Sequence, residues 1–219
     1  MVTAIWYVLR TGCPWRDVPA QFGPWSSVYT RWRRWGASGL WSRILRTLTP
    51  AASGVLRHLD CSHIKLHQDG SNPAGGRAEQ AMGLTKGGIN TKLAAVVDAR
   101  GRAIGLCLAA GQRHDIKAVE PLLPGLANTH VVADRGFDAD TFHRTLNQAG
   151  IRTCIRPKRG RDWRHLFHRG YYRQRHRIEN FFGRIKRHRR IATRYDKLAA
   201  SFLAFVQFAT VLDWLTFQV

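Results

Sequence analysis

The chain has 219 residues, of which 44% are apolar, and these values predict a folded protein of one domain or one domain with a small appendage, not a disordered tail. Its net charge of +21 predicts a polyanionic partner. A membrane is disfavoured, because the longest apolar run, residues 198–212, contains polar residues and is shorter than the about 20 residues of a spanning helix.

The start of the chain, MVTAIWYVLR, lacks the basic region and the small-residue cleavage site of a secretory signal. The four cysteines, Cys13, Cys61, Cys107 and Cys154, lie far apart, so neither a CxxC zinc motif nor a disulfide framework is indicated. We expect a protein of the reducing cytoplasm.

Residues 1–47 hold six of the eight tryptophans and predict a small all-helical domain. An apolar helix over 4–10 ends at the turn TGCPW, and a second helix near Ser26–Gly36 has an apolar face and arginines on its other sides. Two helices around a glycine-containing turn are typical of a helix-turn-helix unit that binds DNA. Alternatively, the tryptophans only hold a helical bundle together, and both interpretations can be true. Residues 48–54 are expected to be a linker to a second domain at 55–219.

The second domain is expected to be α/β, with a mixed sheet covered by helices, because strand patterns alternate with helix patterns. The expected elements are a strand that ends at Asp60, an irregular segment at 63–90, a hairpin around Asp98–Gly101, a helix from Asp115 to Pro124–Gly125, a strand that ends at Asp134, a helix from Asp138 or Asp140 to Gly150, a strand at 151–155, a basic loop at 156–170 and two final helices.

Asp60 and Asp134 differ from most other acids, which suit turns or helix N-caps. Each is the last residue of an apolar stretch, RHLD and VVAD, and is followed by a turn. Ligands of α/β sheets bind beyond the carboxyl ends of the strands, so both side chains could face the same crevice.

Glu179 is the third candidate, and it lies in a very basic stretch. Residues 156–190 contain fourteen Lys or Arg and only two acids. At about 100° per residue, Tyr172, Arg175, Glu179 and Lys186 fall on one stripe of a single helix. A surface ion pair of Arg175 with Glu179 at i, i+4 would explain the spacing equally well.

The chemistry of carboxylates favours Glu179 as a functional residue over a surface ion pair. Carboxylates are the hard oxygen ligands that Mg²⁺ prefers, and two such ions can activate the attacking oxygen and stabilise the leaving oxygen of a phosphodiester. The Lys and Arg residues around Glu179 would hold a polyanion close to the three negatively charged carboxylates.

Five blocks in order resemble the DDE transposases of bacterial insertion sequences, in the group named after insertion sequence five. They are WYVLRTGCPWRDVP, LDCSHIK, GLTKGGINTKLAAVVDARGRAIGLCLAAGQRHD, VVADRGFDAD and YRQRHRIENFFGRIKRHRRIATRYDKLAASFLAF. The last block has the spacing Tyr172-x2-Arg175-x3-Glu179-x6-Lys186, which matches the Y-R-E-K signature of this group. Relatives generally have a further stretch before the first block, so we expect a chain shortened at its N-terminus.

The resemblance implies an RNase H-like core in which Asp60, Asp134 and Glu179 bind Mg²⁺, or Mn²⁺ as a substitute. It implies hydrolysis of a phosphodiester at each element end, followed by attack of the freed 3′-OH on target DNA. A homodimer on double-stranded DNA, at the terminal inverted repeats and in the bacterial nucleoid, is expected. The expected DNA contacts are Tyr172, Arg175, Lys186, Lys86 and Lys92.

Two other functions remain open. A decayed, catalytically inactive transposase would still bind DNA, and the missing N-terminal stretch favours it. A zinc protein would use His63 with His67, or His165 with His168, but no Cys or acid lies at a supporting spacing.

Overall fold

The computed structural model describes residues 1–49, 55–161 and 167–216, so the predicted linker falls mostly outside the described residues. The α-helices are α1 (Val2–Thr11), α2 (Trp25–Ala37), α3 (Leu40–Leu48), α4 (Gly76–Glu79), α5 (Asp115–Val119), α6 (Asp140–Gln148), α7 (Arg169–Arg173), α8 (His176–Lys186), α9 (Arg189–Ala192) and α10 (Ala199–Thr216). The strands are β1 (Leu56–Leu66), β2 (Gly83–Thr85), β3 (Gly88–Val97), β4 (Ala103–Ala110), β5 (His130–Ala133), β6 (Arg152–Ile155) and β7 (Thr193–Arg194). Two of the 3₁₀ helices are η5 (Glu120–Leu126) and η6 (Arg135–Phe137).

The strands form one mixed sheet in the order β2-β3-β1-β5-β6. Strand β4 also pairs with β3, and β7 pairs with the end of β1. Strand β1 is antiparallel to β3 and parallel to β5, and β5 is parallel to β6. The hairpin of β3 and β4 turns at Asp98, as expected, because its carboxylate accepts hydrogen bonds from the backbone N–H of Arg100 and Arg102. The prediction of a mixed α/β sheet is confirmed.

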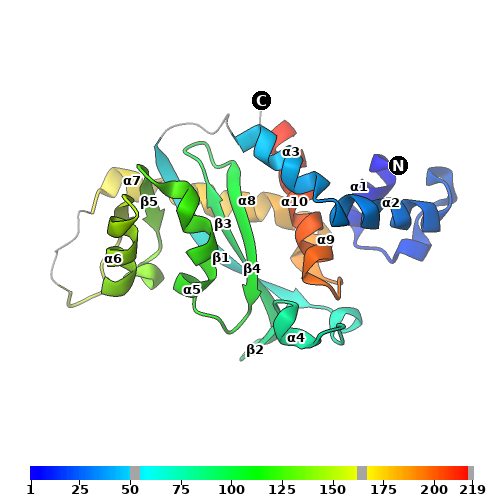
Figure 1. Cartoon of the computed structure of the whole chain (residues 1–219), viewed down its shortest axis with the longest axis horizontal. Helices are drawn as coiled ribbons and strands as arrows, with labels where there is room; N and C mark the ends of the chain where they lie inside the picture. Colours follow the sequence, from blue (N-terminus) through cyan, green and yellow to red (C-terminus); the bar gives the residue numbers. More distant parts are fainter. Residues whose placement is uncertain (50–54, 162–166, 217–219) are drawn as a thin grey trace.

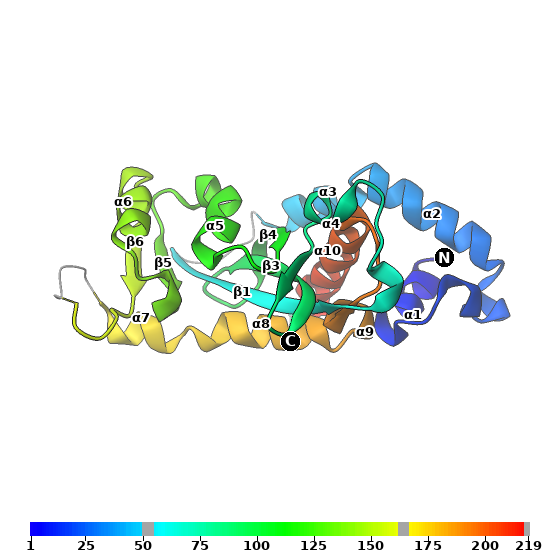
Figure 2. The same ribbon diagram turned by 90° about the horizontal axis from the view of Figure 1, so that it is seen from below.

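Helices cover both faces of this sheet, which explains why β3 is buried along most of its length. Leu59, Ala94 and Val96 pack with side chains of α5, η5 and α6 on one face. Ile64 and Ala95 belong to the core of the other face, together with α8 and α10. Figure 2 shows α7 and α8 in line along this second face, with β1 directly beside them.

The N-terminal helices share the core of the second face, to which α10 also belongs. Trp32 stacks on Phe205 at a ring-centroid distance of 4.0 Å, and the Trp41 and Phe208 ring centroids are 4.4 Å apart. The predicted helices at 4–10 and 26–36 correspond to α1 and α2, which lie at one end of the molecule (Figure 1). Trp32 and Trp41 therefore serve as packing residues, as one of the two interpretations predicted, whereas Trp6 and Trp25 are exposed.

Strand β1 differs from the prediction, because it does not end at Asp60 but continues to Leu66. Antiparallel pairing with β3 extends from His58 to Lys65 and carries polar residues such as Ser62 along with it. The segment expected to be irregular also contains α4 and β2. Asp60 consequently lies inside a strand, opposite Ala95 of β3.

The prediction of one helix from Tyr172 to Lys186 was also wrong. Helix α7 ends at Arg173 and α8 begins at His176, and the junction is closed by i→i+3 hydrogen bonds from the N–H of Arg175 to Tyr172 and of Arg177 to Gln174. Such bonds tighten the turn, so the chain keeps its direction across the break.

Within the described residues, α10 alone is long and apolar enough to pass as a membrane span, and half of that stretch is buried inside the fold. Phe202, Phe205 and Phe208 of α10 belong to the shared core, which accounts for its apolar character without a bilayer.

Candidate active site

Asp60 and Asp134 lie on neighbouring strands, on the face that α7 and α8 cover. Asp60 is in the middle of β1, and Asp134 directly follows β5, which is parallel to β1. The Asp60 carboxylate accepts a hydrogen bond of 2.8 Å from the backbone N–H of Cys61. The parallel pairing therefore brings two predicted acids, separated widely in the sequence, to the same part of the sheet.

Arg175, at the junction, connects Asp60 to Glu179, and Tyr172, in α7, contacts Asp134. One guanidinium nitrogen of Arg175 lies 3.0 Å from Oδ2 of Asp60, and the other donates to Oε1 of Glu179. The Tyr172 hydroxyl donates to Oδ1 of Asp134 at 3.4 Å. The i, i+4 ion pair thus exists, but Arg175 also reaches across to β1, which an ordinary surface ladder does not require.

The pKa of Asp60 is raised from its usual value to about 6, mainly because the carboxylate is buried. The N–H of Cys61 and the charge of Arg175 lower the Asp60 pKa in part, whereas the charges of Asp134 and Asp115 raise it further. Burial also raises the pKa of Tyr172, and the negative charge of Asp134 adds to this effect. Burial is therefore the main reason that the charged form of Asp60 is disfavoured, and a nearby cation would stabilise that form.

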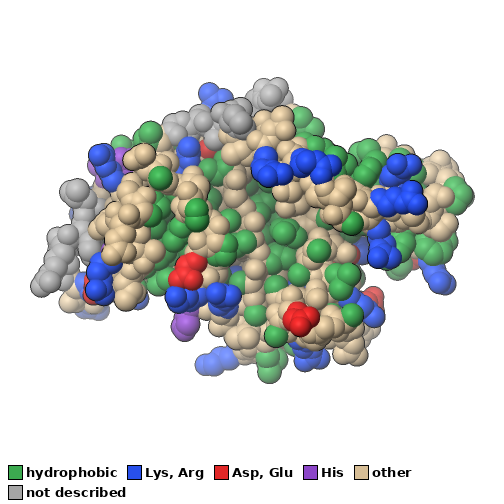
Figure 3. Space-filling model, viewed as in Figure 1, with side chains coloured by type: hydrophobic (Ala, Val, Ile, Leu, Met, Phe, Trp, Pro, Cys, Tyr) green, Lys and Arg blue, Asp and Glu red, His purple; other side chains and the backbone are tan. Residues whose placement is uncertain are grey.

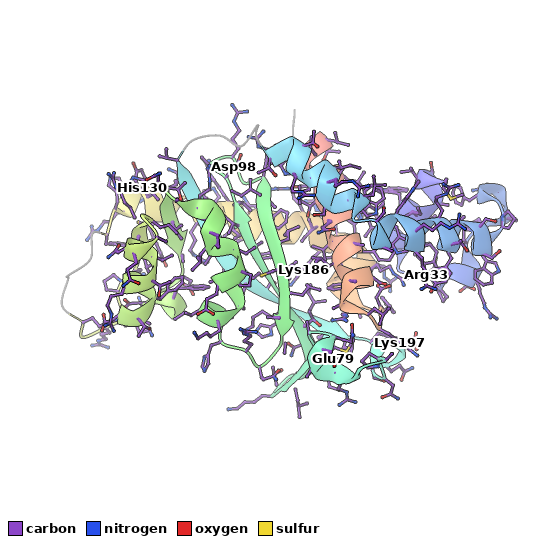
Figure 4. All side chains as sticks on the ribbon, viewed as in Figure 1. Arg33, Glu79, Asp98, His130, Lys186 and Lys197 are labelled. Carbon is purple, nitrogen blue, oxygen red and sulfur yellow. The ribbon has the colours of Figure 1, made fainter. Side chains whose placement is uncertain are left out.

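Lys186 is held against β1, beyond Asp60. Its ammonium group donates to the Ser62 hydroxyl at 2.7 Å and to the carbonyl oxygen of His63 at 3.1 Å. Burial lowers the pKa of Lys186. Figure 4 labels this side chain near the middle of the molecule. Arg175 and Lys186 therefore contact β1 and Tyr172 contacts the residue after β5, whereas Glu179 contacts Arg175.

Of the two lysines in the glycine-rich segment, only Lys86 is exposed, in the turn between β2 and β3. Lys92, expected to contact DNA, is 5% exposed, and its ammonium group lies 2.6 Å from Asp115. Pairing with Asp115 offsets the loss of solvation of the buried charge, so Lys92 is not available to a phosphate in this structure.

Sequence reasoning missed the partners of Lys92 and Lys186. Asp115 was interpreted only as the start of a helix, and it does begin α5, yet it also pairs with Lys92. Ser62, the partner of Lys186, carries no sequence signal, because a serine near the expected end of a strand has many ordinary uses. No local signal in the sequence distinguishes either role.

Asp60, Asp134 and Glu179 fit a hard divalent cation in the chemistry of their donor atoms. Asp60 and Glu179 already share one positively charged group, the guanidinium of Arg175. As they stand, however, no three His, Cys, Asp or Glu side chains in the described ranges form a group that could hold a metal ion. Of the histidines considered for zinc, His63 contacts Asn90 and His67 contacts Asp69, while His165 lies outside the described residues.

The N-terminal helices carry a separate set of cations. Arg31, Arg33 and Arg34 of α2 are exposed, as predicted for arginines on the outer sides of this helix. Figure 3 shows Lys and Arg side chains over α2 and α3, on the face of the molecule opposite α8, and Figure 4 labels Arg33 there.

Two family comparisons cover most of the chain. Residues 1–45 match the family described as "Putative transposase of IS4/5 family", and residues 55–214 match the family described as "Transposase DDE domain". The second match covers the whole sheet as well as the three candidate acids, and it agrees with an RNase H-like fold of this mixed sheet and its helices.

Two curated relatives support the same assignment. A "Putative transposase for insertion sequence element IS6501" from Brucella ovis is 37% identical over 135 residues, which are 58% of this chain and 99% of the relative. An "Insertion element IS402 uncharacterized 16.2 kDa protein" from Burkholderia cepacia is 50% identical over 46 residues, which are 20% of this chain and 31% of the relative. No solved structure matches the chain. On the DDE-domain match and the Brucella relative, the chain belongs to the DDE transposases of insertion sequences.

Proposed function

We propose that this transposase hydrolyses a phosphodiester at each end of its element and joins the freed 3′-OH to target DNA, with Asp60, Asp134 and Glu179 as ligands of divalent metal ions. The observation that carries the proposal is the contact of Arg175 with both Asp60 and Glu179, together with that of Tyr172 with Asp134. Arg175 thus joins Asp60 to Glu179, and Tyr172, three residues earlier, contacts Asp134.

When bound, Mg²⁺ or Mn²⁺ would supply an activated attacking oxygen and charge stabilisation for the leaving oxygen. The chain itself would supply the carboxylates and hold them in place. Asp60 is rigidly placed because it lies within β1 and accepts from the N–H of Cys61. Glu179 is more exposed and lies on α8, so its carboxylate would be able to turn toward a bound cation.

Arg175, Tyr172 and Lys186 would bind DNA beside the carboxylates. The guanidinium of Arg175 is suited to a phosphate because it presents several donors in a planar fork. To reach DNA, it would exchange its two carboxylate partners for a phosphate. Lys86 and the exposed arginines of α2 would contribute sequence-independent contacts, and a homodimer would hold the two ends together.

Replacement of Glu179 by Gln tests the proposal directly, because the amide keeps the shape of the side chain but loses the charge that binds metal. We expect the rate of Mg²⁺-dependent cutting to fall at least about 1,000-fold, with DNA affinity changed less than about threefold. The substrate is a labelled duplex with the DNA that flanks the reading frame.

Glu79→Gln provides the matched control. Glu79 is an exposed glutamate of α4, labelled away from Lys186 in Figure 4, and its replacement should leave cutting unchanged. Retained cutting by the Glu179→Gln variant would refute the assignment of the three acids.

A DNA-binding protein without catalysis is the second candidate, and one observation favours it. The carboxylates do not form a ready-made metal group in this structure. An excision assay in cells, with an N-terminal extension of the reading frame restored where one exists, separates the two functions. Retention on DNA without excision would support the inactive binder.

A further inference from the structure

Three glycines in the described part of the chain have no conformational or packing reason to be glycine. Gly125, Gly136 and Gly183 are exposed, none has a positive φ, and a Cβ added at any of them would meet no atom within 4 Å. Each of the other described glycines has either a positive φ or a neighbouring atom within 4 Å of such a Cβ. Glycine is usually retained for one of these two reasons, so these three positions require another explanation.

The absence of a side chain is most notable at Gly183. Gly183 lies inside α8, and glycine is the least favourable helix residue after proline. Its neighbours do not need the space, because Phe182 is buried and the guanidinium of Arg184 is bound to Asp213 and to the carbonyl oxygen of Gly101. Alanine would therefore suit the fold at least as well as glycine.

Two of these three glycines are next to candidate acids. Gly136 lies in η6, two residues after Asp134. Gly183 lies one helical turn after Glu179, on the same side of α8 as this acid and close to the exposed Asn180. Gly125, in η5, follows α5, which packs on the opposite face of the sheet.

We propose that Gly136 and Gly183 keep the surface beside Asp134 and Glu179 bare, so that the sugar-phosphate backbone of a DNA strand can lie against the protein main chain there. The inference rests on the proposed function, and it names the strand contact of that site. A phosphodiester must come within reach of cations bound to the carboxylates, and a misplacement of about 1 Å can lower a catalysed rate by about 100-fold. A side chain at either position would hold the strand away from the acids.

The test compares Gly136→Ala, Gly183→Ala and the matched control Gly125→Ala. For each variant, the melting temperature, the affinity for a labelled duplex and the rate of Mg²⁺-dependent cutting are measured. We expect cutting by the first two variants to fall about tenfold or more, and cutting by the control to stay within about twofold. The melting temperature should not fall in any of them, and in Gly183→Ala it should rise by up to about 3 °C.

A graded series adds a second measurement. Gly183→Leu should weaken duplex binding and cutting more than Gly183→Ala does, because the obstruction grows with side-chain size. Cutting and binding by both alanine variants at the wild-type level would overturn the inference, as would losses accompanied by a lower melting temperature. If the wild-type protein itself does not cut, the proposed function fails. The strand contact is then judged by binding alone, and unchanged binding of Gly183→Leu would refute it.

Discussion

Among single residues, His58 occupies an environment that should be costly for its side chain. It lies in β1, its exposed fraction is 0%, and neither ring nitrogen has a hydrogen-bond partner in the structure. Burial lowers the His58 pKa to about 4, and the positive charges of Arg177 and His176 act in the same direction. The imidazole is therefore neutral in the folded protein at neutral pH, whereas in the unfolded chain it takes up a proton near pH 6.5.

Replacement of His58 by Leu should make unfolding less sensitive to acid. Because the folded pKa is lowered, the histidine destabilises the fold progressively as pH falls from about 6.5 toward 4. The difference in unfolding free energy between variant and wild type should grow by about 2 kcal/mol from pH 7.5 to pH 5. Asp60, whose pKa is raised to about 6, acts in the opposite direction over this range, so the comparison must be between variant and wild type. Urea unfolding at both pH values measures this difference, and the exposed His114→Gln serves as the control. The same difference in unfolding free energy at both pH values would contradict the prediction.

At the scale of elements, the sequence predicted the local patterns well and the long-range ones less well. Apolar runs and turn residues correctly placed the β3–β4 hairpin, and β5 ends at Ala133, one residue before its expected end at Asp134. The extension of β1 past Asp60 was missed because it depends on pairing with β3, about thirty residues away. The break between α7 and α8 was missed because helical spacing alone does not show a tightened turn.

Arg194, in the short strand β7, connects several elements and gives a prediction at this scale. Its side chain is fully buried and donates to the carbonyl oxygens of Gln80, Asp196 and Lys197 and to the hydroxyl of Thr91. Arg194→Met should lower the unfolding free energy by about 3 kcal/mol, since it leaves buried acceptors without donors. Denaturant titration measures this loss. The exposed Arg77→Met, in α4, should change stability by less than about 0.5 kcal/mol, and a loss of that size for Arg194→Met would contradict the prediction.

At the scale of the whole molecule, residue spacing was informative about the site even where the element prediction was wrong. Tyr172 and Arg175 are not on α8, yet they contact Asp134 and Asp60 because the chain keeps its direction through the junction. Lys92 shows the limit of such reasoning. Sequence alone does not distinguish a solvated lysine from one that is buried against Asp115, since the difference depends on how α5 packs on the sheet.

The shared core makes a further prediction about the N-terminal helices, which the sequence presented as a domain of their own at residues 1–47. Trp32 of α2 packs on Phe205 of α10, and both are buried in the cluster that also contains Ile178 of α8. Removal of this side chain should therefore weaken the whole molecule and not only its N-terminal end. We expect Trp32→Ala to lower the unfolding free energy by about 3–5 kcal/mol.

Unfolding of wild type and variant should each follow one transition, the same by tryptophan fluorescence as by far-ultraviolet circular dichroism. Trp25, which is 36% exposed and lies at the start of α2, provides the control, and Trp25→Ala should change stability by less than about 1 kcal/mol. Two separate transitions, with only the first one shifted by Trp32→Ala, would show instead that the N-terminal helices fold independently of the sheet. A single transition would mean that the N-terminal helices and the sheet unfold as one cooperative unit, as their shared core predicts.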